Sequence, residues 1–249
     1  MMKLLATDMH IRNINRKTIR SDTIAILPIA SIEDHGPLPI ATDFMIAECI
    51  CRELESRLRD KITLFETIPY TTCVEHSACG TAIGVDFDTF YRYLVQILKS
   101  IANIFRGVII VLTHGGALQC VYAASRYVRI STGKNIVIAS VLEIVKNYIL
   151  RVYGINVDII HADPIEASIL LQCGYSYGIK EVPKDVVLNT IRQGMDMHRI
   201  EGVIHPWICL DPAIRDRYVA ESVIGSKELG RELIEAIIDT IAKTVQSFF

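Results

Sequence analysis

The chain has 249 residues, enough for one large α/β domain but too few for two average domains and a linker. Its formal net charge of −2 gives no reason to expect a nucleic acid or an acidic membrane as a partner. Apolar residues make up 51% of the chain, which is typical of a globular protein with ample core material. We therefore expect one domain over residues 1–249.

The cysteines and the N-terminus bear on the cellular compartment. The chain has seven cysteines, and the odd count without any C-x-x-C pair argues against a disulfide framework or a thiolate zinc cage. Residues 1–14 lack the apolar core of a signal peptide, and no apolar run approaches the roughly 20 residues of a membrane helix. These features predict a cytoplasmic protein.

Apolar strand-like segments alternate along the chain with segments whose apolar residues repeat at helical spacing. Strands are predicted over residues 24–31, 62–70, 107–113 and 135–142, and helices over residues 43–60, 87–105, the segment that ends at 129, 164–173 and 226–248. Asp43 is the predicted N-cap of the first helix. This alternation indicates an α/β fold with a mostly parallel sheet between helices, in which ligands bind beyond the carboxyl ends of the strands.

The first polar cluster follows the first predicted strand and contains Glu33, His35 and Asp43. In an extended segment residues i and i+2 face the same side, so Glu33 and His35 can reach one point. Gly36 and the two prolines after it would turn the chain so that Asp43 faces them. Two carboxylates and an imidazole suit a divalent metal such as zinc, manganese or iron(II). The alternative is an N-cap aspartate beside two solvated loop residues.

Two further clusters also stand where strands end or helices begin. His114 follows the most strand-like run, and the paired glycines after it, Gly115 and Gly116, would let backbone approach a ligand or simply turn the chain. His161 lies in a polar turn and could act as a general acid or base. Glu166 would fall in a first helical turn, where the helix dipole favours a carboxylate even without a function.

A fourth cluster spans residues 75–81 and allows three interpretations. Cys73, His76 and Cys79 could suggest a zinc site, but no second pair of ligands stands nearby. A Cys79–His76 nucleophile pair is conceivable, although neighbours in sequence rarely form such pairs. Contact between the substrate and the backbone of Gly80 and Thr81 is the favoured interpretation.

Together these segments resemble the creatininase family of amidohydrolases, in order and with similar spacing from about residue 20 to residue 245. The segments that match the family's signatures are 28–43, 113–117 and 161–168, with Glu75, His76, Gly80 and Thr81 as a further element. The resemblance implies a three-layer α/β/α domain, usually a homohexamer, with a two-metal site and a small-molecule substrate.

The resemblance also implies a role for each matching residue. Glu33, Asp43 and His114 would hold one metal, and His35, Asp43 and Glu166 the other, with Asp43 as the bridge. A hydroxide activated by two metals would attack the substrate, and His161 would donate a proton to the leaving nitrogen, with Glu166 at the reacting centre. The proposed substrate-contacting residues are His76, Gly80, Thr81, Gly115 and Gly116.

Departures from the family pattern limit the substrate. Creatininase proper has a tyrosine and a glutamate where Gly115 and Gly116 stand here, so creatinine is not the expected substrate. Asp163 replaces a usual glycine, and Pro37 is followed at once by Leu38, one residue short of many members. Relaxed motifs of this kind resemble an archaeal branch that deformylates 2-amino-5-formylamino-6-ribosylaminopyrimidinone 5'-phosphate in riboflavin and deazaflavin (F420) biosynthesis. A lactam or peptide-precursor hydrolase and a non-catalytic paralogue with a structural or regulatory role are the alternatives.

Overall fold

A computed structural model of the chain describes residues 10–78, 80–157, 161–193, 208–210, 216–217 and 219–249. Its centre is a four-stranded parallel sheet in the order β2-β1-β3-β4. The strands are β1 (Ile24–Ile29), β2 (Ile62–Leu64), β3 (Gly107–Leu112) and β4 (Asn135–Ser140). Every residue of β1 and β3 is buried, as expected for parallel strands covered on both faces.

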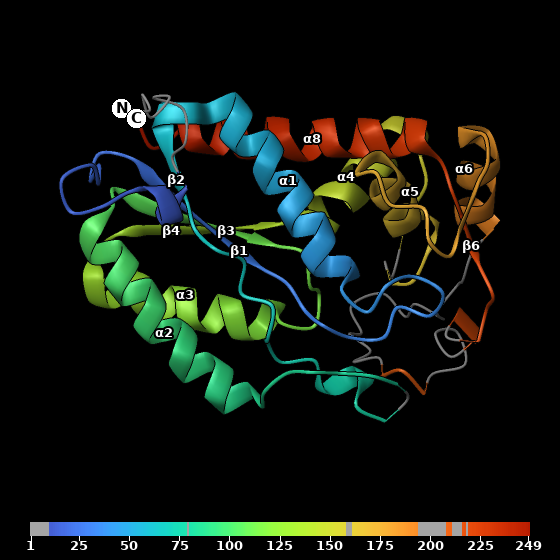
Figure 1. The fold of residues 1–249 in the computed structure, drawn as a ribbon, viewed down its shortest axis with the longest axis horizontal. Coiled ribbons are helices and arrows are strands. Elements are labelled where there is room, and N and C mark those ends of the chain that lie inside the picture. Colours follow the sequence, from blue (N-terminus) through green and yellow to red (C-terminus); the bar gives the residue numbers. More distant parts are fainter. Residues whose placement is uncertain (1–9, 79, 158–160, 194–207, 211–215, 218) are drawn as a thin grey trace.

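Helices cover both faces of this sheet (Figure 1). One face packs on α2 (Phe87–Ile104) and α3 (Leu118–Thr132), and the other on α1 (Thr42–Leu58), α4 (Val141–Tyr153), α5 (Pro164–Gln172) and α8 (Lys227–Gln246). Side chains of β1 alternate between the two cores: Ile24 and Ile26 pack in the core with α1 and α8, whereas Ala25 and Leu27 pack in the core with α2 and α3. The predicted α/β fold with a parallel sheet between helices is confirmed.

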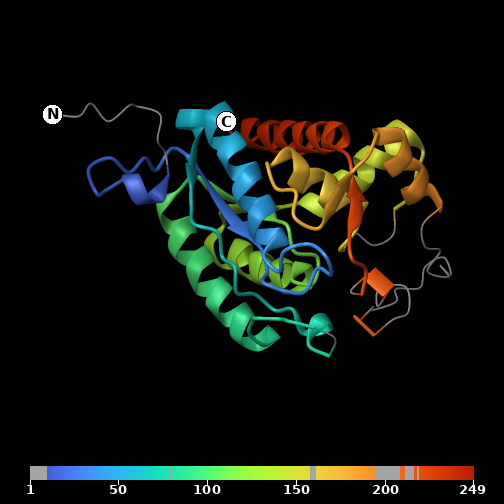
Figure 2. The ribbon, with the colours of Figure 1, turned by 45° about the vertical axis from the view of Figure 1, so that its right-hand side comes forward.

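A smaller unit lies beyond the sheet, next to α5 (Figure 2). It contains the two parallel strands β5 (Ile179–Glu181) and β6 (Val223–Gly225) and the helix α6 (Lys184–Gln193). The described residues also contain three short 3-10 helices: η1 (Ile11–Asn13), η2 (Arg59–Lys61) and η3 (Val74–His76). No helix in the described residues is both long and apolar enough to cross a membrane.

Two local predictions are wrong. The fourth strand ends at Ser140, and α4 begins directly after it, with the Ser140 hydroxyl capping the helix, whereas the sequence pattern predicted a strand to residue 142 and left the residues of α4 unassigned. The apolar run continues unbroken from strand to helix, so periodicity gives no signal of the change. Asp43 is not the N-cap of α1: Ala41 is, without a side-chain bond, and the Asp43 carboxylate hydrogen-bonds to Ser31 instead.

The expectation that cysteines are not paired is also wrong. Cys49 in α1 and Cys173 after α5 form a disulfide, with their Cα atoms 5.8 Å apart. The two residues are 124 positions apart in sequence and meet only because α1 packs against α5. Cys51, Cys73 and Cys120 are free and buried.

Candidate metal centre

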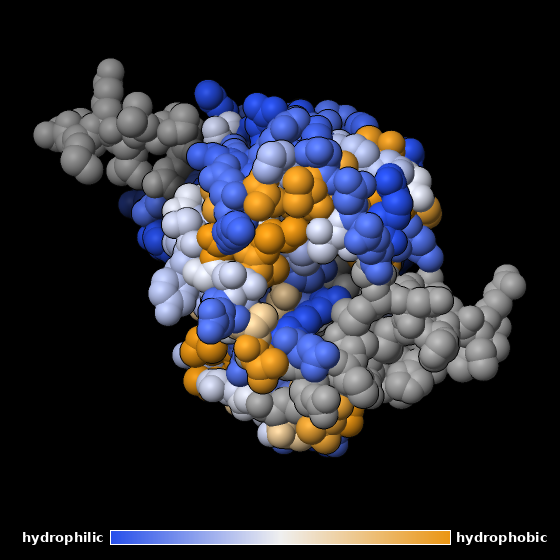
Figure 3. Space-filling model, turned by 90° about the vertical axis from the view of Figure 1, so that its right-hand side faces the viewer, coloured by the Kyte–Doolittle hydropathy of each residue, from blue (hydrophilic) through white to orange (hydrophobic). Residues whose placement is uncertain are grey.

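The site lies where β1 and β3 end. These strands are neighbours in register, with Ile29 opposite Leu112, so the segments that follow them leave the sheet at the same edge. Figure 3 views the molecule from this side and shows a hollow near its centre in which hydrophilic side chains gather. The polar residues of the sequence motifs therefore converge, as their positions after strands predicted.

The loop after β1 turns polar side chains inward in the predicted alternation. Glu33 and His35 are each 1% exposed, while Asp34 between them is more exposed. The loop then folds back on itself, with the Glu33 N–H donating to the Ile40 carbonyl at 2.9 Å. This return places Asp43, in the first turn of α1, beside the two inward-facing residues.

Glu33, Asp43 and His114 form a first trio of buried ligand-type side chains, whose ligand atoms all lie within 4.8 Å of one another. His114 Nδ1 is 3.2 Å from Glu33 Oε1 and 3.3 Å from Asp43 Oδ2.

His35, Asp43 and Glu166 form a second trio on the other side of Asp43. His35 Nε2 is 3.7 Å from Asp43 Oδ1 and 3.8 Å from Glu166 Oε1. Asp43 therefore presents one carboxylate oxygen to each trio. On this side the group whose ligand atoms all lie within 4.8 Å of one another is His35, His161 and Glu166, without Asp43, and Glu33, His76 and His161 form a further group of this kind.

The outer nitrogen of each histidine is fixed by a backbone carbonyl. His35 Nδ1 is 3.0 Å from the Glu33 carbonyl, His114 Nε2 is 2.9 Å from the Thr72 carbonyl, and His161 Nε2 is 2.9 Å from the Asp34 carbonyl. Where the outer nitrogen donates this bond, the inner nitrogen of the ring faces the carboxylates and can bind a metal once it has lost its proton, which is the arrangement of metal-binding histidines.

Two buried polar atoms in the trios, Glu33 Oε2 and His35 Nε2, have no hydrogen-bond partner among the described residues. An ion would satisfy them, and the mixed imidazole and carboxylate donors suit zinc, manganese or iron(II). The residues present thus fit a pair of divalent ions.

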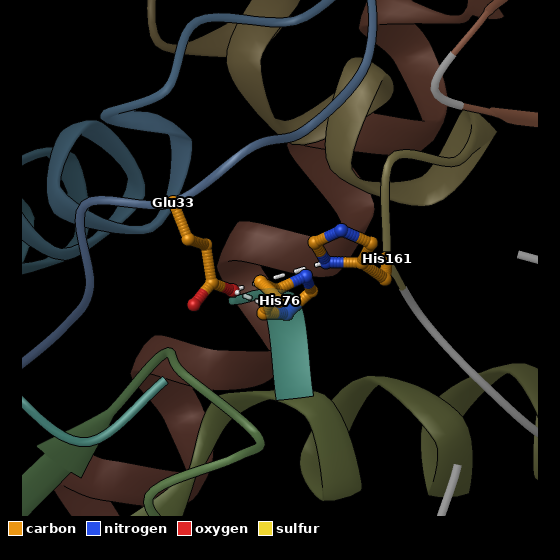
Figure 4. Close-up of side chains that lie close together, drawn as sticks. All are labelled: Glu33, His76 and His161. Carbon is orange, nitrogen blue, oxygen red and sulfur yellow. Dashed lines mark ion pairs between the residues drawn. The ribbon is translucent and has the colours of Figure 1, made fainter. Parts of the chain in front are cut away.

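His76 and His161 both approach the carboxylate of Glu33 (Figure 4). His76 Nε2 is 3.2 Å and His161 Nδ1 is 3.9 Å from Glu33 Oε1, and the two imidazole rings lie 4.4 Å apart between centroids. His161 also lies 4.4 Å from the ring of His35. His161 therefore sits between the two trios, in the bend that precedes α5 as the sequence predicted, and it is buried.

Glu166 is held by the start of α5. Asp163 caps this helix by accepting from the N–H groups of Ile165 and Glu166, which explains an aspartate at a position where the family usually has glycine. Ala162 has a positive φ of 49°, a backbone conformation that directs its N–H to Glu166 Oε2 at 2.7 Å. The other oxygen, Oε1, remains directed at His35.

Burial and opposite charges shift the pKa values of the trios strongly. Burial alone would raise the pKa of Glu33, but His114 and His76 hold it well below its usual value. Burial lowers the pKa of His35, yet Glu166 and Asp43 raise it to about 10. The pKa of His114 is likewise raised by Glu33 and Asp43 against the effect of burial.

His161 and Glu166 shift in directions that suit proton transfer. Burial and the neighbouring His35 and His76 lower the pKa of His161 well below its usual value, so its imidazole is neutral. Burial raises the pKa of Glu166 to about 8, with Asp43 adding to the rise and His35 opposing it. Perturbed groups gathered in one buried cluster are typical of a functional site.

The predicted substrate contacts lie around this cluster. Gly80 and Thr81 are exposed, and Gly80 packs against the Asp34 side chain. Gly115 is exposed next to His114, and Gly116 is partly buried. Cys79 of the conceivable Cys79–His76 pair lies outside the described residues.

Three contributors to the site were not predicted from the sequence. Glu75 and Thr72 approach the outer face of His114, and Arg217 donates to the backbone carbonyl of His161. Glu75 stood inside a motif and could have been found from it, whereas Thr72 acts through its carbonyl and Arg217 is distant in sequence, so neither gives a signal.

Comparison with known proteins identifies a family and a fold for this chain. Residues 7–245 match the family model described as "Creatininase: Creatinine amidohydrolase". No curated protein matches the chain. A crystal structure of creatinine amidohydrolase (creatininase) superposes with a TM-score of 0.69 at 17% identity, covering 97% of this chain and 98% of the other.

Two other solved structures carry metals in their names. "Creatininase Mn" matches with a TM-score of 0.68, covering 97% of this chain and 99% of the other. A creatininase mutant named as the "Zn-Zn type" matches with a TM-score of 0.67, covering 97% and 98%. Both are 17% identical to this chain.

Proposed function

The chain belongs to the creatininase family of metal-dependent amidohydrolases, and on that premise we propose that it hydrolyses a formamide or a small cyclic amide with two divalent ions bound in the two trios. The position of Asp43 is the observation that carries the proposal. Its two carboxylate oxygens face His114 and His35 separately, as a residue that bridges two ions must.

The bound ions would supply an activated water nucleophile and polarise the carbonyl under attack. His161 moves the proton. Its Nε2 is 2.9 Å from the Asp34 carbonyl and its Nδ1 is 3.9 Å from Glu33 Oε1. The lowered pKa keeps the ring neutral, so a proton taken up on Nδ1 is readily given away again. Protonated on Nδ1, His161 can then donate to the leaving nitrogen, which is the usual double role of a catalytic histidine.

Glu166 and His76 position these groups. Glu166 is anchored through Oε2 to the Ala162 N–H, which leaves Oε1 for the ion of the second trio. His76 Nε2 contacts Glu33 Oε1, and its ring lies beside that of His161, so His76 stands next to the group that would transfer the proton. Gly115, exposed beside His114, leaves room for a substrate that a larger side chain would exclude.

For the substrate we propose the formylamino group of the ribosylaminopyrimidinone 5'-phosphate, with release of formate. The support is the sequence: Gly115 and Gly116 replace the side chains expected of an enzyme for creatinine, and the relaxed motifs resemble the deformylating branch. The homohexamer implied by the same resemblance stays a prediction that analytical ultracentrifugation would measure.

The test combines elemental analysis with two product assays. Protein purified without oxygen or chelators is analysed for metal, then incubated with the formylaminopyrimidine nucleotide and, separately, with creatinine. We expect about two ions per chain, formate from the nucleotide and no creatine from creatinine. A metal-loaded His161→Ala variant is the matched control for contaminating activity, because it should hold metal without turnover.

Each other outcome points to a different conclusion. Two ions per chain without formate would refute the substrate and leave a lactam or peptide-precursor hydrolase to be tested. Two ions without any hydrolysis across formamides, lactams and peptides would indicate a non-catalytic relative. No metal after reconstitution would refute the proposed function itself.

A further inference from the structure

Glu75 is a buried carboxylate that neither trio uses. Its side chain is only 12% exposed, and its Oε1 has no hydrogen-bond partner among the described residues. That oxygen lies 3.5 Å from Nε2 of His114, on the side of the ring opposite the first trio. An acidic oxygen buried without a partner costs free energy, so its position calls for a compensating role.

The segment that contains Glu75 wraps around the first trio. The Thr72 carbonyl accepts from His114 Nε2, and His76 Nε2 contacts Glu33. Glu75 and His76 are adjacent in the 3-10 helix η3, which turns one toward His114 and the other toward Glu33. The backbone of Glu75 is held in turn, because its carbonyl accepts from the Cys209 N–H at 3.0 Å. Thus one short segment contacts two of the three members of the trio from outside.

Gly116 makes the approach of Glu75 possible. A Cβ atom at position 116 would overlap Glu75 Oε1 and lie 2.8 Å from His114 Nε2. The neighbouring Gly115 differs, because a Cβ there would meet only a Leu142 methyl at 3.1 Å. Position 116 must therefore be glycine, because the Glu75 carboxylate occupies the space of a side chain there. The same carboxylate places no such constraint on position 115.

We propose that Glu75 is a positioning residue for the first ion, which acts through the outer face of His114. This inference rests on the proposed two-metal function. A carboxylate behind a ligand imidazole fixes the ring and makes its inner nitrogen a stronger donor, and removing such a partner typically lowers metal affinity about 10- to 100-fold. Among the described residues, Glu75 pairs with His114 and with neither His35 nor Glu166, so its effect should be confined to one ion.

The test measures stepwise affinities for zinc and cobalt by competition with a chromophoric chelator. Glu75→Gln keeps the shape and removes the charge, so we expect one of the two ions to bind about 10- to 100-fold more weakly and the other as in the wild type. The cobalt d–d absorption of that one site should shift. Gly116→Ala should reproduce the loss by displacing Glu75, while Gly115→Ala should leave both affinities unchanged.

A double variant shows whether Gly116 acts through Glu75. In the Glu75→Ala background the overlap with Glu75 Oε1 is gone and only the 2.8 Å approach of the added Cβ to His114 Nε2 remains. Gly116→Ala should therefore cost less affinity there than in the wild type, whereas independent effects would multiply. The inference would be overturned if Glu75→Gln kept the wild-type affinities and cobalt spectrum, or if it weakened the binding of both ions equally. It would also be overturned if the affinity losses of the two single variants multiplied in the double variant. Failure of the wild type to bind metal would instead refute the proposed function, so the two failures are distinguishable.

Discussion

Replacement of Asp43 by asparagine tests the bridge between the two trios. Asp43 is 3% exposed, with Oδ2 at 3.3 Å from His114 Nδ1 and Oδ1 at 3.7 Å from His35 Nε2. Asparagine keeps the size and can still accept from the Ser31 hydroxyl, which is 2.9 Å from Oδ2. The substitution therefore removes a charge that both ions would share and leaves the packing of α1 in place.

The expected loss follows from the burial of Asp43. Removing one partner of a buried charged pair costs about 3–5 kcal/mol. At about 1.4 kcal/mol per factor of ten, each ion should bind between about a hundredfold and a few thousandfold more weakly. Because the same carboxylate contacts both trios, the two ions should be lost together.

The assay is metal content and affinity in chelator-buffered solution, with circular dichroism to confirm folding. Glu53→Gln is the matched control, since it neutralises an exposed carboxylate on the same helix and should retain both ions. Retention of both ions at wild-type affinity in Asp43→Asn would refute the bridging assignment. Loss of one ion alone would mean that Asp43 serves a single site.

Three further predictions follow from the same contacts. His161→Ala should retain the metal content and lower turnover by about 10²- to 10⁴-fold, measured by steady-state kinetics, and loss of metal would show that His161 is a ligand. The pKa of His35 is raised to about 10 and that of His114 is also raised, so both are protonated near neutral pH; binding must displace these protons, and affinity should rise with pH up to about 10. Calorimetry in buffers of different ionisation enthalpy measures that release, and its absence would contradict the pKa shifts. Reduction of the Cys49–Cys173 disulfide by a dithiol should lower the free energy of unfolding, measured in urea titrations, by about 2–4 kcal/mol. The Cys49→Ser variant is the control: it lacks the disulfide, so the dithiol should not change its free energy of unfolding.

The sequence by itself determined the fold class and the place of the site. Continuous apolar strands that alternate with helices are typical of a parallel sheet buried on both faces. The strands of such a sheet all end at the same edge, which is where ligands bind. Alternation after β1 placed Glu33 and His35 on the same side, and the structure has both buried there. Such patterns depend on residues close together in sequence, so they can be recognised without knowledge of the tertiary contacts.

Tertiary structure decided what depends on distant residues. An aspartate at the start of a helix can either cap that helix or direct its carboxylate elsewhere, and the sequence does not distinguish the two. Only the packing of α1 against the loop after β1 turned the Asp43 carboxylate toward the histidines. The pairing of Cys49 with Cys173 needed two helices to meet across 124 positions. Likewise, the sequence allowed Gly116 either to turn the chain or to let backbone approach a ligand, and only the tertiary structure shows that Glu75, from another segment, occupies the space of its missing side chain. Sequence spacing encodes periodicity along an element, whereas the distances between elements are set by how their side chains pack.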